Sequence, residues 1–184
     1  MVDATAGPRF LCDAMLGRLA RWLRLLGYDA RYADLPDEAL VALARVEGRV
    51  LLTRDTRLVR RPDVGPHGFI RHDRVPEQLR QVAADFRLGP DRAGTRCLRC
   101  NVALEALPRE GAAGRVPPHV WRTQHQFTRC PSCARIYWPG THWDRMTEAL
   151  HSLQPSWART EGRGLRAEAG PANSVLRPQS SATD

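Results

Sequence analysis

The sequence predicts an α/β fold in which a parallel sheet is flanked by helices and is followed by a small cysteine-bearing module. Short apolar runs that suit buried strands alternate with segments of helical periodicity over the first half of the chain. Because crossovers between parallel strands are right-handed, this alternation favours one sheet with helices on both faces. Two close cysteine pairs in the second half predict the separate module.

The first expected strand covers residues 10–12, which are all apolar and are followed directly by Asp13. Such a run is typical of a strand that is buried on both faces. A helix should follow over residues 16–26, because leucine and alanine recur there at helical spacing while arginines mark another face. Gly27 supplies the stop for this helix.

A second strand is expected over residues 28–32, followed by a helix that begins near Asp34 and ends at Gly48. The third strand is the clearest, because residues 50–52 form a compact apolar run that continues into Asp55. Asp55 is therefore a second acid at the end of a predicted strand.

The last part of the sheet is expected after a loop rich in Arg, Pro and Gly. Residues 69–70 suggest a fourth strand, and residues 76–86 suggest a helix that buries one apolar face. Ligands of open parallel sheets bind at the carboxyl ends of the strands. Asp13 and Asp55 both fall at such ends, so this part of the sheet is the expected site.

Changes in composition divide the chain into three parts. A linker of Pro, Gly and Arg near Gly94 separates a predicted α/β domain at residues 9–93 from a cysteine module at residues 94–150. Residues 151–184 are rich in Gly, Ala, Ser, Pro and Arg and show little apolar periodicity. We expect this last part to be a disordered tail.

The chain is basic, with a net charge of +8 and 28 basic residues that are all arginine. Guanidinium groups pair with phosphates in bidentate fashion, so such a surface suits nucleic acid, although a basic balance is as easily explained by solubility. No run reaches the roughly 20 apolar residues that cross a bilayer, and the N-terminus lacks a secretory pattern. The expectation is a cytoplasmic protein without a membrane segment.

Four cysteines have the spacing of a structural zinc site. Cys97 and Cys100 form one pair, Cys130 and Cys133 form another, and 29 residues separate the two pairs. Two such turns can close a tetrahedral thiolate shell around Zn²⁺, and the short segment between them needs a metal to fold. An iron–sulfur cluster is the main alternative, and disulfides or redox dithiols do not suit a cytoplasmic chain.

Several carboxylates are candidates for a catalytic metal site. Asp13 and Asp55 lie at adjacent strand ends, Glu38 lies near the start of its helix, and Asp73 follows the fourth strand. Mg²⁺ and Mn²⁺ prefer oxygen ligands, and metal-dependent phosphodiester cleavage uses converging carboxylates. The competing interpretation is that each aspartate only caps the turn that follows it.

The order of these segments resembles the Mut-seven C-terminal RNase domain family. The resemblance rests on residues 10–29, on Leu51-Leu52-Thr53-Arg54-Asp55, on the two cysteine pairs and on an aromatic segment at residues 137–143. These blocks occur in the family's order and cover residues 9–150.

This resemblance implies a PIN-like nuclease domain joined to a zinc ribbon, and metal-dependent cleavage of RNA by Asp13, Glu38 and Asp55. Asp73 would supply a fourth acid. We expect the backbone of the RNA to contact basic side chains near these acids, namely Arg18, Arg21 and Arg54. The alternative is a non-catalytic RNA-binding protein that acts within a ribosome- or RNA-associated complex, with the acids serving as caps.

Overall fold

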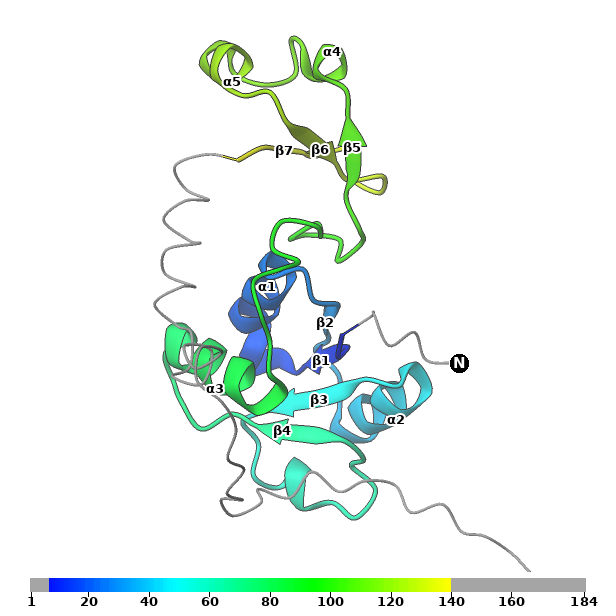
Figure 1. The fold of residues 1–184 in the computed structure, drawn as a ribbon. Coiled ribbons are helices and arrows are strands. Elements are labelled where there is room, and N and C mark those ends of the chain that lie inside the picture. Colours follow the sequence, from blue (N-terminus) through cyan, green and yellow to red (C-terminus); the bar gives the residue numbers. More distant parts are fainter. Residues whose placement is uncertain (1–6, 140–184) are drawn as a thin grey trace, which may run out of the picture.

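A computed structural model describes residues 7–139 of the chain, and it contains two separate sheets (Figure 1). The first has four parallel strands in the order β2-β1-β3-β4, and the second has three antiparallel strands in the order β5-β6-β7. The predicted fold class is confirmed: a parallel sheet flanked by helices is followed by a cysteine-bearing module consistent with a zinc ribbon.

The elements of the first sheet alternate along the chain as predicted. The strands are β1 (Phe10–Cys12), β2 (Ala30–Tyr32), β3 (Val50–Thr53) and β4 (His67–Phe69). The helices are α1 (Gly17–Leu25), α2 (Asp37–Glu47) and α3 (Val75–Phe86), with short 3₁₀ turns η1 (Ala14–Leu16) and η2 (Leu58–Arg60).

Helices cover both faces of this sheet. The packing of β1 shows this, since neighbouring residues of a strand point to opposite faces. Phe10 and Cys12 of β1 pack with α1 and α3, whereas Leu11 between them packs with α2. Figure 1 shows α2 across the sheet from α1 and α3. Cys12 is fully buried, and this burial, with a smaller effect of Asp13, raises the pKa of its thiol to about 12.

Strand β2 begins at Ala30 and not at residue 28, because the residues before it complete the end of α1. The N–H of Gly27 donates to Arg24 O and that of Tyr28 donates to Leu23 O, over 2.9 Å in each case. These two bonds are those of a Schellman cap, which requires a left-handed residue, and Gly27 has φ 84°.

Two other boundaries also differ from expectation. Helix α2 begins at Asp37 and not near Asp34, because Leu35 precedes Pro36 and the residue before a proline avoids helical conformations. Strand β4 lies at residues 67–69, slightly earlier than predicted, in register with residues 51–53 of β3.

The glycine that caps α1 is also enclosed, which makes its replacement informative. A Cβ at Gly27 would lie 2.0 Å from the carbonyl oxygen of Arg92, whereas Gly48, which caps α2 with φ 60°, has no atom within 4 Å of such a Cβ. We expect Gly48→Ala to lower the free energy of unfolding by about 1 kcal/mol and Gly27→Ala by about 3 kcal/mol or more. Urea denaturation of both variants tests this, and equal losses would contradict the steric argument.

The second sheet contains β5 (Glu105–Leu107), β6 (Phe127–Arg129) and β7 (Ile136–Tyr137). Strands β5 and β6, between the two cysteine pairs, are joined by two helices that were not predicted from the sequence, α4 (Arg109–Ala112) and α5 (Pro118–Thr123). Each follows a proline, and their buried residues form a small core with β6 that contains Ala112, Val116, Val120 and Phe127.

The predicted division at residues 93 and 94 stays a prediction. The predicted tail at residues 151–184 and the segment at residues 140–143 lie outside the described residues. Within residues 7–139, no helix combines the length and the apolar character that crossing a bilayer requires.

Candidate functional site

The four parallel strands end side by side, and we call this side of the sheet the carboxyl edge. Asp13 follows β1 there and is only 5% exposed. Its Oδ1 accepts a hydrogen bond from the N–H of Met15 over 2.9 Å, and its Oδ2 accepts one from the hydroxyl of Thr53. Groups from two neighbouring strand ends therefore fix this carboxylate.

Thr53 connects the two aspartates at the ends of β1 and β3. Its buried hydroxyl donates to Asp13 and accepts the N–H of Asp55 over 2.9 Å. The Oδ1 of Asp55 accepts the N–H groups of Arg57 and Leu58, over 2.6 and 3.3 Å. The sequence analysis missed Thr53, although a threonine two residues before an aspartate can form such local hydrogen bonds.

Glu38 and Asp73 also lie at the carboxyl edge, but each is paired with an arginine. Glu38 Oε1 lies 2.9 Å from Arg61 Nη1, and its own backbone N–H together with this guanidinium lowers the pKa of Glu38. Asp73 forms an ion pair with Arg54. Both carboxylates are largely exposed.

Thr53 links the carboxylate of Asp13 to the backbone N–H of Asp55, but the structure does not draw the four predicted acids into one cluster. Within residues 7–139, the only group of three or more His, Cys, Asp or Glu side chains close enough together to hold a metal ion is formed by cysteines. Over the same residues, the ion pairs engage Glu38 and Asp73 but neither Asp13 nor Asp55.

Two buried glutamines of α3 hold the loop that carries Asp73. Gln78 Nε2 donates to the carbonyl oxygens of His72 and Asp73, over 3.0 and 3.2 Å. Gln81 donates to Phe69 O over 2.7 Å and accepts the N–H of Arg71 over 3.0 Å. These side-chain amides provide hydrogen-bond partners for the backbone of residues 69–73, at and after the end of β4. The loop is thereby fixed against α3.

The three arginines predicted to contact RNA have different environments. Arg18 and Arg21 are exposed on α1, with Arg18 in its first turn. Arg54 is partly buried after β3 and holds Asp73. A solvated helix face explains the first two as well as RNA binding does, so their role stays a prediction.

The second candidate site is the group of four cysteines. The sulfur atoms of Cys97, Cys100, Cys130 and Cys133 all lie within 4.8 Å of one another, and the cysteines are free. The Sγ atoms of Cys97 and Cys133 are 3.8 Å apart. That distance matches the edge of a tetrahedron with Zn–S bonds of about 2.3 Å, so this donor set fits one zinc ion.

The two cysteine pairs adopt the same local geometry. In each pair the N–H of the second cysteine donates to the sulfur of the first, over 3.3 Å in one pair and 3.4 Å in the other. The residue after each pair is left-handed, with φ 61° at Asn101 and 59° at Ala134. These repeated turns point two sulfurs from each pair toward one centre.

Tyr137 of β7 lies beside this centre, with its hydroxyl 3.2 Å from Cys97 Sγ. Burial opposes ionisation of Cys97, but hydrogen bonds from Tyr137 and from the Cys100 N–H lower the pKa of this thiol to about 6. Burial and the neighbouring thiol in turn raise the pKa of Tyr137. These bonds favour the thiolate of Cys97, which is the form that binds metals, whereas burial raises the pKa of Cys130.

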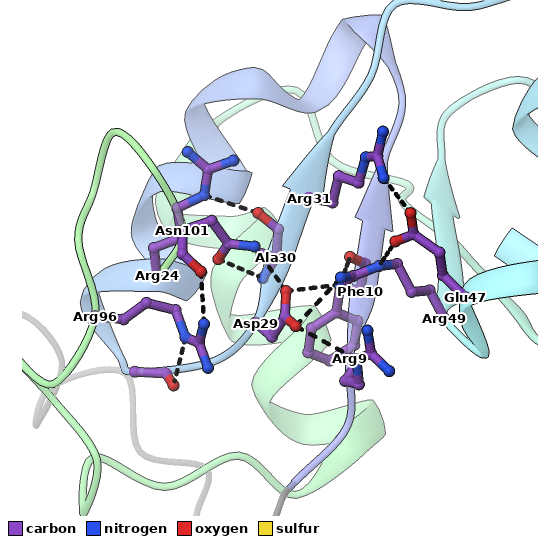
Figure 2. A network of polar contacts seen from close by, with 11 residues as sticks. Arg9, Phe10, Arg24, Asp29, Ala30, Arg31, Glu47, Arg49, Arg96 and Asn101 are labelled. Carbon is purple, nitrogen blue, oxygen red and sulfur yellow. Dashed lines mark hydrogen bonds and ion pairs between the residues drawn. The ribbon is translucent and has the colours of Figure 1, made fainter. Parts of the chain in front are cut away.

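The first cysteine pair is attached to the sheet by a buried arginine of α1, Arg24, and Figure 2 shows this arginine bonded to Ala30 of β2. Arg24 Nε donates to Ala30 O over 2.7 Å, and its Nη1 donates to the carbonyl oxygens of Leu98 and Arg99 over 2.9 and 3.1 Å. One guanidinium therefore joins strand β2 to the turn between Cys97 and Cys100.

Asn101, which follows the first cysteine pair, adds a second set of hydrogen bonds between this pair and β2. Its Oδ1 accepts the N–H of Ala30 over 3.1 Å, and its Nδ2 donates to Asp29 Oδ1 over 2.6 Å. Asp29 also pairs with Arg9 and Arg49, and Figure 2 shows it at the centre of the network. Burial alone would raise the pKa of Asp29, but hydrogen bonds from Arg49 and Asn101 lower it.

The comparisons with known proteins give one family match. A family described as the Mut7-C RNAse domain matches residues 8–150, a range that includes the carboxyl edge and all four clustered cysteines. Neither the comparison with curated proteins nor the comparison with solved structures gives a match. Because the match spans most of the 184 residues, the chain belongs to the Mut7-C RNAse domain family.

Proposed function

We propose that this protein is a ribonuclease that uses Mg²⁺ or Mn²⁺ to hydrolyse RNA phosphodiester bonds at the carboxyl edge. The observation that carries this proposal is that Thr53 bonds both the carboxylate of Asp13 and the backbone N–H of Asp55, while neither acid belongs to the ion pairs of residues 7–139. Membership of a family described as an RNAse domain supports it. Two neighbouring acids without an arginine partner favour binding of a cation.

The donor set fits such an ion. Mg²⁺ is commonly held by one or two carboxylates and completes its shell with water and phosphate oxygens. Asp13 and Asp55 would hold the ion, and Thr53 would orient the carboxylate of Asp13. When bound, a divalent ion supplies Lewis-acid charge stabilisation and activation of water.

The remaining predicted residues have supporting roles in this proposal. Glu38 and Asp73 would join the site by releasing their arginine partners and binding the metal ion instead. Arg54, once released by Asp73, would then be able to pair with a phosphate of the RNA. Arg18 and Arg21 would contact the backbone farther along α1.

The zinc proposed for the cysteine cluster has a different purpose. Four thiolates close a tetrahedral shell and leave no open position for water or substrate. We assign to this zinc the folding of the module and not the chemistry, because the small core around Phe127 is too limited to fold the segment alone.

A metal-dependence assay tests the ribonuclease. The full-length protein, with its zinc content measured, is incubated with labelled single-stranded RNA with and without added Mn²⁺ or Mg²⁺. We expect cleavage only with an added ion. Cleavage should persist when a 2′-deoxynucleotide occupies the cleaved position, because water and not the 2′-hydroxyl is the nucleophile.

One observation favours a second function, which is RNA binding without cleavage. Asp13 and Asp55 each cap a short turn, so capping alone accounts for their positions. Binding without cleavage across varied RNAs and both ions would support this alternative and contradict the proposed ribonuclease. A steep loss of binding with salt would then show that phosphate contacts dominate.

A further inference from the structure

Large apolar side chains are exposed beside the proposed active site. Within residues 7–139, four such side chains are exposed, and three of them belong to the carboxyl edge: Met15 (60%), Tyr32 (43%) and Leu35 (42%). Met15 lies in the turn after β1, Tyr32 ends β2, and Leu35 follows three residues later. The fourth, Val46, is near the end of α2, just before the start of β3 and thus at the opposite edge.

The ring of Tyr32 has a defined position in this group. Tyr32 is paired in register with Cys12, so it stands next to the strand end that delivers Asp13. Its ring lies against Gly17 at the start of α1, where a Cβ would be only 3.2 Å from Cε2. The absence of a side chain at position 17 therefore allows the ring to rest against the helix.

The exposed apolar side chains lie near a carboxylate, that of Asp13, and near an arginine, Arg18. The backbone of Met15 donates directly to the carboxylate of Asp13, and Arg18, which follows Gly17, is exposed. Tyr32 thus ends the strand beside the one that delivers Asp13, and Arg18 lies in the first turn of the helix against which the Tyr32 ring rests. A base has an apolar face that stacks on such a ring, and its phosphate pairs with such a cation.

We propose that Tyr32, supported by Met15 and Leu35, forms a stacking site for one unpaired base of the RNA. This inference rests on the proposed function for the identity of the ligand. The base would lie on the exposed ring, and the neighbouring phosphate would lie over Asp13 and Asp55. Because the bases of a duplex are already stacked on each other, this site selects single-stranded segments.

Binding of RNA to the full-length protein tests the stacking site separately from cleavage. Fluorescence anisotropy with an unstructured oligoribonucleotide is measured without added Mg²⁺ or Mn²⁺. We expect Tyr32→Ala to weaken binding about tenfold, and Tyr32→Phe to bind like the unchanged protein because the ring remains. Val46→Ala removes an exposed apolar side chain from the opposite edge and should have no effect.

An abasic scan then shows whether Tyr32 contacts a base. In the unchanged protein, removing the base at one position of the oligonucleotide should weaken binding about tenfold, and in Tyr32→Ala the same removal should have little effect. Equal effects of the abasic position in both proteins, or unchanged binding by Tyr32→Ala, would overturn the stacking site. Tyr32-dependent binding without any cleavage would support the site while contradicting the ribonuclease.

Discussion

Replacing Asp13 by asparagine is expected to lower RNA cleavage by about 100-fold or more while the protein stays folded. The carboxylate is nearly buried and lies at the point where β1 and β3 end. Asparagine can still accept the N–H of Met15 and face the hydroxyl of Thr53, so the cost in stability should be about 1 kcal/mol. What it removes is the negative charge that would hold the proposed ion.

The measurement is the initial rate of cleavage of single-stranded RNA with Mn²⁺, beside thermal unfolding of the same samples. Asp85→Asn is the matched control, because it makes the same chemical change at an exposed position near the end of α3. If Asp13→Asn cleaves RNA as fast as Asp85→Asn does, the carboxyl edge is not the active site.

The hydroxyl of Thr53 provides a finer test of the same geometry. Thr53→Val keeps the shape of the side chain but leaves the buried Oδ2 of Asp13 without its donor, which should cost about 1–3 kcal/mol of stability. Cleavage should fall about tenfold, and Thr53→Ser should restore it because the hydroxyl returns.

Loss of zinc is the second change with a large expected effect. Cys130→Ser, or removal of the metal by a chelator, is expected to unfold the cysteine module and to reduce the zinc content from one ion per chain to none. The module buries only a small apolar core, whereas structural zinc contributes about 10 kcal/mol or more of apparent binding free energy in small domains.

Elemental analysis of the metal and hydrogen exchange of residues 97–137 measure this effect. Cys12→Ala is the control, because Cys12 is buried in the first sheet and is not part of the cysteine cluster. That variant should lose some stability but keep its zinc. Iron in the purified protein, or folded protein without any metal, would contradict the assignment.

The parts of the fold that the sequence predicted are those with a strong local pattern. The consecutive apolar residues of β1 and β3 and the spaced cysteines require no information from distant residues. The predicted start of β2 was wrong because Tyr28, which has strand-like character, completes the cap of α1 through its N–H. The helices α4 and α5 were missed because each is too short to show helical periodicity.

The candidate site could be predicted only in part for a similar reason. That Asp13 and Asp55 end neighbouring strands follows from the order of the elements, but their link through Thr53 joins residues 40 positions apart. The pairing of Glu38 with Arg61 depends on where η2 places the chain after β3. Such contacts are set by packing between distant segments, and no local sequence pattern predicts them.

The attachment of the first cysteine pair to β2 has a consequence for how the protein is made. Strand β2 is at the edge of its sheet, and an uncovered edge strand is a template for aggregation. Its N–H and C=O groups at Ala30 are occupied by Asn101 and Arg24. During synthesis Arg24 emerges before β2 and can occupy the C=O of Ala30 at once, whereas the N–H of Ala30 gains its partner only after Asn101 has emerged.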